Sequence, residues 1–405
     1  MQIKPIFFDH SSTTPVDPRV MEAMMPYFCE KFGNPSSHIH SVGREALKAL
    51  DNSREIISQL IGAKTEEIIF TSGATESNNL AVKGISRAYR DRGNHILVSQ
   101  IEHYSILNSA KRLRSEGFQV EMISVDGYGR VKLDELKEKL RNDTVLVSIM
   151  LSNTEIGTIE PIEEITNIVK QFNKDIIVHT DASSSAGWIP VDVQKLGVDA
   201  LTISAHNFYG PKGAGALYLK EGVKIDPLLD GGFQEKGYRS GIENVPAIVG
   251  MAEAAKLAMS EMEERNKKLI HLQKKLWKGL EDNLDYLHFT GHPEIRLPGH
   301  VSFWVEFAEG ESILLFLQVS GIMAASGSAC SSNLRAQDEE DLVASHVLAA
   351  VGVPSDICSG SVTFLMGKDN TKEEVDQVVE ALPNIIERLW AMSPAYADML
   401  KEKQK

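Results

Sequence analysis

The chain has 405 residues, of which 42% are hydrophobic and 24% are charged, and its formal net charge is −14. This composition is typical of a folded protein that is large enough for more than one core. The acidic balance argues against a nucleic acid as a direct partner, because the phosphates would be repelled. We also expect neither a signal peptide nor a membrane-spanning helix, since no apolar segment has the required length and flanks.

The number and spacing of the cysteines indicate the redox environment of the protein. The chain has three cysteines, Cys29, Cys330 and Cys358, which are odd in number and far apart. A disulfide framework is therefore not predicted, and we expect a cytoplasmic protein.

The first 260 residues alternate between strand and helix patterns. Alternation of this kind predicts a mainly parallel seven-stranded sheet with helices on both faces. The predicted strands are nearly continuous apolar runs, as in strands that are buried on both faces. The strands are expected at 67–71, 95–99, 120–125, 145–151, 176–180, 200–204 and 216–219, and the main helices at 42–61, 76–90, 103–116, 133–140 and 162–172.

The pattern changes after Gly231 and Gly232. A long helix is predicted over 243–284, and shorter elements follow it: strands at 297–307, 322–325 and 361–366, and helices at 311–320, 345–350 and 371–388. We therefore expect a larger α/β domain over 15–260 and a smaller α+β domain formed by 1–14 and 261–405. The charged end 401–405 is predicted to be disordered.

Polar residues follow the ends of two predicted strands in a way that suits a phosphate and a flat ring. Ala74 and Thr75 follow Gly73 and directly precede the predicted helix over 76–90, where backbone N–H groups and the helix dipole attract an anion, although a plain helix cap would look the same. His103 follows the next strand and could cover a flat ligand, although a capping histidine is the more ordinary interpretation.

Two further strands end in polar residues. Asp181 could hold a protonated ring nitrogen or cap the segment after it, and Ser204 and His206 end another strand. Because the carboxyl ends of parallel strands meet at one edge of a sheet, we expect all these groups to face one crevice.

Cys330 lies among small residues, in Ser-Gly-Ser-Ala-Cys-Ser-Ser over 326–332, and a long polar segment follows it. This context predicts an exposed thiol suited to a nucleophile or a sulfur carrier. Cys29 and Cys358 are interpreted as structural. A metal site formed by Cys330 and Cys358 is a weaker alternative, because no CxxC spacing supports it.

Together these segments resemble the cysteine desulfurases of the pyridoxal-phosphate type I aminotransferase fold. The matching segments run almost through the whole chain: FGNPSS (32–37), TSGATESNN (71–79), EH (102–103), EIG (155–157), HTDA (179–182), SAH with GPKG (204–206 and 210–213), GG (231–232), RSG (239–241) and SGSAC (326–330).

The resemblance implies a role for each matching residue. The phosphate of pyridoxal 5'-phosphate would be held by Ala74, Thr75, Ser204 and His206, His103 would stack on the pyridine ring, and Asp181 would pair with the ring nitrogen and keep the ring an electron sink. Cys330 would take sulfur from L-cysteine as a persulfide and pass it to an iron–sulfur scaffold protein or another acceptor. The family resemblance also implies a homodimer.

Five family positions carry other residues here. The Schiff-base lysine falls at Asn207, and the substrate-carboxylate arginine falls at Thr363. The asparagine and glutamine beside the cofactor's phenolic oxygen fall at Thr154, next to Asn153, and at Ser184. The phosphate-binding residue from the neighbouring subunit falls at Ile242. Lys212 cannot replace the lysine, because it lies beyond the Gly210-Pro211 turn.

Three functional hypotheses follow. In the first, the protein mobilises sulfur from L-cysteine on Cys330 for iron–sulfur cluster assembly or thiolation, with non-covalent cofactor and weakened chemistry, in which His103 or His206 moves the proton. In the second, an inactive homologue acts as a sulfur relay or scaffold partner, or contributes Cys330 as a ligand to an iron–sulfur cluster shared with a partner; no other metal site is expected. In the third, a pyridoxal enzyme acts on a different amine.

Overall fold

The computed structural model describes residues 5–326, 345–354 and 361–403. Its largest sheet has seven strands in the order β2-β8-β7-β6-β5-β3-β4, and only β8 runs antiparallel to its neighbours. The predicted mainly parallel seven-stranded sheet is therefore confirmed. The strands are β2 (Ile68–Thr71), β3 (His95–Ser99), β4 (Gln119–Ile123), β5 (Thr144–Ser148), β6 (Ile177–Asp181), β7 (Ala200–Ser204) and β8 (Gly215–Leu219).

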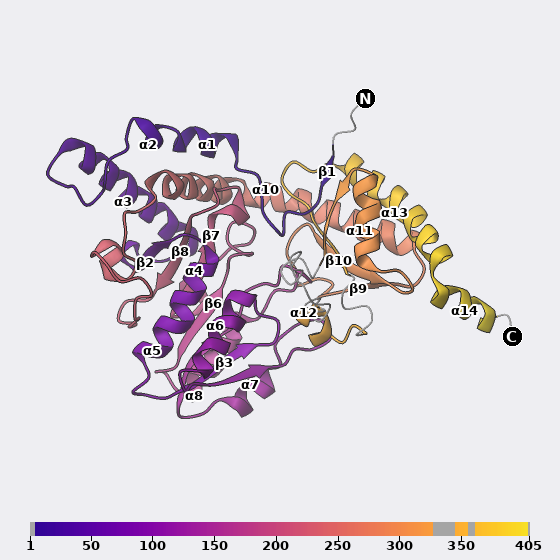
Figure 1. The fold of residues 1–405 in the computed structure, drawn as a ribbon, viewed down its shortest axis with the longest axis horizontal. Helices are drawn as coiled ribbons and strands as arrows, with labels where there is room; N and C mark the ends of the chain where they lie inside the picture. Colours follow the sequence, from indigo (N-terminus) through magenta and orange to yellow (C-terminus); the bar gives the residue numbers. More distant parts are fainter. Residues whose placement is uncertain (1–4, 327–344, 355–360, 404–405) are drawn as a thin grey trace.

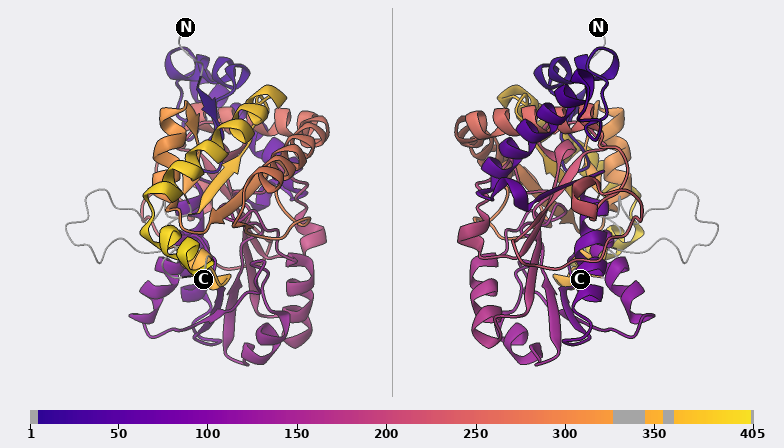
Figure 2. Two further views of the ribbon diagram at one scale, coloured as in Figure 1. Left: turned by 90° about the vertical axis from the view of Figure 1, so that its right-hand side faces the viewer. Right: turned by 90° about the vertical axis from the view of Figure 1, so that its left-hand side faces the viewer.

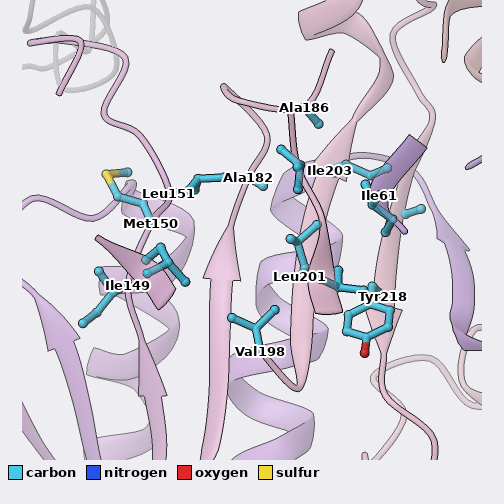
Figure 3. Packing of buried hydrophobic residues seen from close by; sticks show 14 of the residues in the cluster. Ile61, Ile149, Met150, Leu151, Ala182, Ala186, Val198, Leu201, Ile203 and Tyr218 are labelled. Carbon is cyan, nitrogen blue, oxygen red and sulfur yellow. The ribbon is translucent and has the colours of Figure 1, made fainter. Parts of the chain in front are cut away.

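Successive side chains of these strands enter two different cores, as the pleat of a β-strand requires. On β7, Leu201 and Ile203 belong to one apolar cluster, whereas Ala200 belongs to the other. On β8, Tyr218 joins the first cluster and Leu217 joins the second. Figure 3 shows side chains of the first cluster gathered along the strands. The strands are nearly continuous apolar runs because an apolar core covers each face of the sheet.

Helices cover both faces. The first cluster includes residues of α3, α7, α8 and the first part of α10, and the second includes residues of η2 and α6. Asp17 caps α1 by accepting from Arg19 N–H, with Pro18 at the first helical position. Gly62 ends α3 in a left-handed conformation, with φ of 67°. The helices are α1 (Pro18–Met24), α2 (Pro26–Cys29), α3 (Ser41–Ile61), α4 (Ala74–Asn79), the π-helical η2 (Leu80–Ile85), α5 (Ser86–Ala88), α6 (Tyr104–Arg114), α7 (Leu133–Lys139), α8 (Ile162–Phe172) and α9 (Val193–Leu196).

The long helix α10 (Val245–Asn283) leads to a second sheet, of order β12-β13-β10-β9. A third apolar cluster lies here and also takes in Ile6 and Phe8 from the N-terminal segment, whose strand β1 pairs with β11. Figures 1 and 2 show these C-terminal elements gathered on one side of the large sheet. The elements are β1 (Ile6–Phe7), β9 (Leu287–Phe289), β10 (His300–Val305), β11 (Ile322–Met323), β12 (Ala325–Ser326), β13 (Val362–Leu365), α11 (Gly310–Val319), α12 (His346–Ala350), α13 (Lys372–Met392) and α14 (Pro394–Lys403).

The prediction of disorder at the end of the chain is wrong for residues 401–403, which belong to helix α14. This helix has an aromatic anchor, because Tyr396 stacks on Trp390 with 5.0 Å between ring centroids. Lys403 also donates a hydrogen bond to the hydroxyl of Tyr286. Within the described residues, no helix has the length and apolar character needed to cross a membrane.

Candidate functional site

The carboxyl ends of β2 and β7 meet through β8. Gly215, the first residue of β8, pairs with both Thr71 and Ser204. A Cβ atom at Gly215 would lie 2.6 Å from the Cα atom of Gly73, so only glycine lets the turn after β2 approach this closely. The start of α4 therefore lies against the end of β7.

The predicted phosphate residues lie around this turn. Ala74 and Thr75 begin α4 directly after Gly73, and a Cβ built on Gly73 would lie 3.9 Å from the Oγ of Ser204. Ser204 Oγ and His206 Nδ1 are buried and have no hydrogen-bond partner among the described residues. Burial, and then the charge of Lys212, lower the pKa of His206. Buried polar atoms without partners next to a helix start suit a bound anion.

A chain of hydrogen bonds joins the predicted ring-stacking histidine to the predicted ring-nitrogen partner. His103 Nδ1 accepts from Ser105 N–H at 3.1 Å and lies 2.8 Å from Ser105 Oγ. Asn78 Nδ2 donates to Ser105 Oγ at 2.9 Å and to Asp181 Oδ2 at 2.6 Å. Since His103 Nδ1 accepts the backbone N–H, the proton of the neutral ring is on Nε2.

Asp181 has further donors at its other oxygen. Oδ1 accepts a hydrogen bond from Ser183 N–H at 2.9 Å and another from Ser183 Oγ. Among the described residues no arginine or lysine forms an ion pair with this carboxylate. Three neutral donors orient the carboxylate and leave its charge available to a cationic group of a ligand.

Asn207 stands at the position predicted for covalent attachment, and its side-chain amide forms a hydrogen bond within the protein. Asn207 Nδ2 donates to the backbone carbonyl of Ser183, with 2.9 Å between the atoms. The backbone carbonyl of Asn207 accepts from Trp188 Nε1 at 2.6 Å. Ser184 is half-buried in the same turn after β6, and Lys212 is exposed. Asn207 therefore fastens the short helix η3 (Ala205–Phe208) to this turn.

A cavity of about 100 Å³, partly open to solvent, lies beside His103. It is bounded by both parts of the molecule, since His103 and Thr154 follow strands of the large sheet whereas Thr363 belongs to β13. Its described lining residues are Ser11, Ser12, Ile101, Glu102, His103, Tyr104, Met150, Asn153, Thr154, Glu155, Ala325, Ser326, His346, Val347 and Thr363.

Two carboxyl groups at this cavity have pKa values well above the ordinary value of 4.5. Burial raises the pKa of Glu102 to about 8 although Ser99 Oγ and Met150 N–H donate to its Oε1. Burial also raises the pKa of Glu155 to about 8 although Ser345 Oγ donates to it. Both carboxyls are thus mostly protonated near neutral pH.

The fold and these contacts can be compared with known proteins. The model of the family described as aminotransferase class V matches residues 6–378. The chain belongs to the class V aminotransferase family. A cysteine desulfurase IscS of Methanosarcina thermophila is 48% identical over 391 residues, which cover 96% of this chain and 94% of that protein.

Further relatives agree with this family. A cysteine desulfurase IscS 1 of Archaeoglobus fulgidus is 48% identical over 390 residues, covering 96% of this chain and 99% of that protein. A solved structure titled NifS-like protein superposes with a TM-score of 0.87 at 39% identity, covering 95% of this chain and 99% of that one. These matches agree with the predicted pyridoxal-phosphate type I aminotransferase fold.

The predicted site residues fall into two connected groups. His103, Thr154 and Thr363 line the cavity. The second group lies around the turn after β2 and the ends of β6 and β7, and Asn78 connects it to His103 through Ser105. Its members are Ala74, Thr75, Asp181, Ser184, Ser204, His206 and Asn207. Cys330 and Cys358 lie outside the described residues.

Sequence reasoning missed several contributors. Asn78 and Ser105 connect two predicted residues, and Ser345 and His346 bring α12 to the cavity: Ser345 bonds Glu155, and His346 Nε2 lies 3.0 Å from the backbone carbonyl of Glu102. The matching segments contain Asn78, Glu102 and Glu155, and this is the signal that could have drawn attention to them. No comparable signal marks His346.

Proposed function

We propose that this protein is a cysteine desulfurase-like protein that mobilises sulfur from L-cysteine as a persulfide on Cys330, for iron–sulfur cluster assembly or thiolation. The observation that carries the proposal is the 48% identity to a named cysteine desulfurase over 96% of the chain. Sulfur would pass from Cys330 to an iron–sulfur scaffold protein or another acceptor.

The residues present fit pyridoxal 5'-phosphate at two of its ends. The unpartnered Ser204 Oγ and His206 Nδ1, with the helix start at Ala74, suit its phosphate, and the oriented carboxylate of Asp181 suits its protonated ring nitrogen. When bound, this cofactor supplies an electron sink for bonds at the substrate's α-carbon. His103, whose neutral ring has its proton on Nε2, lies at the cavity and would cover the ring or move a proton.

The residues do not fit covalent attachment of that cofactor. Asn207 offers an amide instead of an amine, and this amide is bound to the Ser183 carbonyl. Thr363 likewise uses its hydroxyl on the Glu155 backbone carbonyl, at 2.9 Å. We therefore propose that any cofactor is bound non-covalently and that the chemistry is weakened.

The same two contacts favour a second candidate function. Asn207 and Thr363 bind backbone carbonyls of the protein itself instead of a cofactor or substrate. The alternative is therefore an inactive homologue. It would relay sulfur, bind a scaffold or contribute Cys330 to a cluster shared with a partner. Its Cys330 would receive sulfur from an active desulfurase.

Persulfide transfer tests the proposal. Purified protein is given pyridoxal 5'-phosphate and L-cysteine, and the persulfide on Cys330 is measured by mass spectrometry after alkylation. The proposal expects slow persulfide formation that is lost in Cys330→Ala and in His103→Ala. If wild-type protein stays unmodified with L-cysteine but is loaded by an active desulfurase, the relay function replaces it.

We further propose a homodimer. Five large apolar side chains are exposed on α2, on the segment between α2 and α3 and on the segment before α10, with Ile39 84% and Phe233 94% exposed; the others are Phe28, Phe32 and Ile242. The segments that carry them lie side by side, since Pro35, Ser36, His38 and Phe233 line one pocket. Apolar side chains that gather on one surface mark a contact with another protein. Light scattering coupled to gel filtration should give twice the chain mass for the wild type, and Phe233→Asp with Ile242→Asp should shift the protein towards the monomer. A monomeric wild type would contradict the proposal.

A further inference from the structure

The turn 154–157 forms part of the cavity wall beside His103. Its shape is set by Asn153, whose side-chain oxygen accepts hydrogen bonds from the backbone N–H groups of Glu155 and Ile156, at 2.9 and 3.1 Å. These bonds close the turn on itself and leave its backbone carbonyl groups for other partners. The position of the wall therefore depends on what binds those carbonyls.

All four carbonyl groups of the turn accept hydrogen bonds from the part of the chain that carries the four-stranded sheet. The donors lie on β10, on β13 and on the segment before β10: His300 Nε2 bonds Thr154 at 2.9 Å, Thr363 Oγ1 bonds Glu155 at 2.9 Å, Arg296 Nη2 bonds Ile156 at 3.2 Å and Leu297 N–H bonds Gly157 at 2.9 Å. The large sheet thus supplies this wall of the cavity, and the four-stranded sheet holds it in place.

His300 has one arrangement of its proton that satisfies both of its neighbours. Arg296 Nη2, which can only donate, lies 2.9 Å from His300 Nδ1, so Nδ1 accepts and the proton is on Nε2, where it is donated to the Thr154 carbonyl. Burial, and then the charge of Arg296, lower the pKa of His300 to about 3, so the ring stays neutral. A Cβ atom at Gly157 would lie 2.5 Å from His300 Nδ1, which shows how closely the ring packs on the turn.

Arg296 is itself held by several fixed contacts. Its side chain is buried, and among the described residues its hydrogen-bond partners are neutral groups, including the backbone carbonyls of Thr290 and Ile156, each at 3.2 Å. Its guanidinium also lies 5.0 Å from the ring centre of Trp277. A planar guanidinium held at several points presents its remaining N–H in a fixed direction, and this N–H orients His300.

We propose that His300 is a positioning residue for the cavity: held in one tautomer by Arg296, it fixes Thr154 in the wall and so sets how well a pyridine ring binds there. His300 is fully buried and is not among the residues that line the cavity, so it acts through the backbone of the turn. The inference rests on the proposed function, because pyridoxal 5'-phosphate supplies that ring.

The position of the turn also predicts what His300 does not affect. The unpartnered Ser204 Oγ and His206 Nδ1, which suit the phosphate, belong to the group of site residues around the turn after β2. None of the four bonds that hold the turn 154–157 involves that group. Loss of the His300 bond should therefore weaken binding of the ring and leave binding of phosphate unchanged.

Two variants of His300 that differ by one methylene test this. The amide nitrogen of glutamine matches Nε2 of histidine, so His300→Gln keeps the bond to Thr154. The shorter His300→Asn keeps an acceptor for Arg296 but does not reach Thr154. Pyridoxine 5'-phosphate is the ring probe, because it carries the ring and phosphate of the cofactor but no aldehyde that lysines would attack. Inorganic phosphate is the second probe and reports on the phosphate end alone.

Isothermal titration calorimetry at neutral pH should show that His300→Asn binds pyridoxine 5'-phosphate about five- to tenfold more weakly than the wild type, as the loss of one hydrogen bond implies. Its affinity for inorganic phosphate should equal that of the wild type, and His300→Gln should restore the affinity for the ring probe. Val301→Ala is the matched control: Val301 is the next residue of β10, is buried and points to the other face of the strand. This variant loses core packing and should bind both probes as the wild type does.

Unchanged binding of the ring probe by His300→Asn overturns the inference. An equal loss of both probes, or a loss that His300→Gln or Val301→Ala shares, also overturns it, because the role of His300 is then only structural. If the His300 variants do not fold, Arg296→Lys replaces them: it keeps the charge but lacks the planar fork that reaches Ile156 and His300 together, and it should show the same selective loss.

These titrations also separate the inference from the proposed function. A wild type that does not bind pyridoxine 5'-phosphate, or an Arg296→Lys variant that binds it unchanged, overturns the positioning role of His300. Binding requires no turnover, so a protein that shows the selective loss but forms no persulfide on Cys330 confirms the role of His300 and contradicts only the proposed sulfur chemistry.

Discussion

Asn207 and Ser183 are joined by a hydrogen bond of 2.9 Å from the amide of one to the backbone carbonyl of the other. The bond connects η3, which follows β7, to the turn that follows β6. The residue that replaces the family's lysine is therefore part of the local structure and not merely a missing amine. This relationship predicts what its replacement will do.

Asn207→Lys should gain covalent attachment of added pyridoxal 5'-phosphate, because it places an amine at the family's attachment position. Borohydride reduction followed by mass spectrometry measures the attachment. Asn207→Ala is the control: it should gain no attachment and lose about 1 kcal/mol of unfolding free energy with its hydrogen bond. If the wild type is modified as fully as Asn207→Lys, another amine, such as Lys212, has taken the role.

Asn78→Ala should lower the free energy of unfolding by about 1–3 kcal/mol, because it removes a buried donor from Asp181 and from Ser105. Urea denaturation measures the change. Asn79→Ala is the neighbouring control: Asn79 is only partly buried and donates to the Thr75 carbonyl of its own helix, so its loss should cost under about 0.5 kcal/mol. Equal effects of the two variants would show that the buried bridge contributes nothing.

Stability should fall as the pH rises from about 4.5 to about 8, because Glu102, Glu155 and Glu160 have pKa values raised by burial from 4.5 to about 8. A raised folded-state pKa gives stability that is complete below 4.5 and is lost as the pH rises through about 8. Each carboxyl contributes a slope of up to about 1.4 kcal/mol per pH unit.

Urea denaturation of the wild type and of Glu160→Gln between pH 6 and 8 checks this pH dependence. The variant should lose less stability over the interval, because one buried carboxyl no longer titrates. Two parallel curves would contradict the raised pKa of Glu160.

Arg54→Ala should lower the unfolding free energy by about 3–5 kcal/mol, because it leaves the buried Glu235 without its cation. Arg54 donates to both carboxylate oxygens of Glu235, at 2.5 and 2.8 Å, and Glu235 Oε2 also accepts from Phe70 N–H of β2. Thermal or urea unfolding measures the loss. The double variant Arg54→Ala/Glu235→Gln should recover part of it, since no buried charge then remains. If the double variant recovers none of the unfolding free energy, the loss comes from packing and not from the buried charge.

Local patterns were enough to predict most of the large sheet. Strands buried on both faces are nearly continuous apolar runs, and the helices predicted over 42–61 and 162–172 agree with α3 and α8. The pattern failed where the cause is tertiary: the short strand β9 exists because it pairs with β10, and α14 is held by the ring of Trp390. The π-helical turns of η2 also left no mark in the apolar spacing.

Some features of the candidate site could also be predicted from the sequence, whereas others depend on tertiary contacts. Its residue types at strand ends were readable, because parallel strands end at one edge. The Asn78–Asp181 bond joins residues 103 positions apart, and the raised pKa values of Glu102 and Glu155 come from packing, so neither could be read from the sequence. The two-domain division, the homodimer, the cytoplasmic location and the role of Cys330 stay predictions.

Helix α10 belongs to two cores at once. Its first half contributes Met251 and Ala255 to the large-sheet cluster, and its second half contributes Leu272 and Leu276 to the small-sheet cluster. At 1.5 Å per residue, its 39 residues form a rod roughly 58 Å long. The cavity is lined by residues that follow strands of the large sheet and by Thr363 of β13 in the small sheet. A helix-breaking proline near the middle of α10 should therefore change how these two parts are held together without altering any residue that lines the cavity.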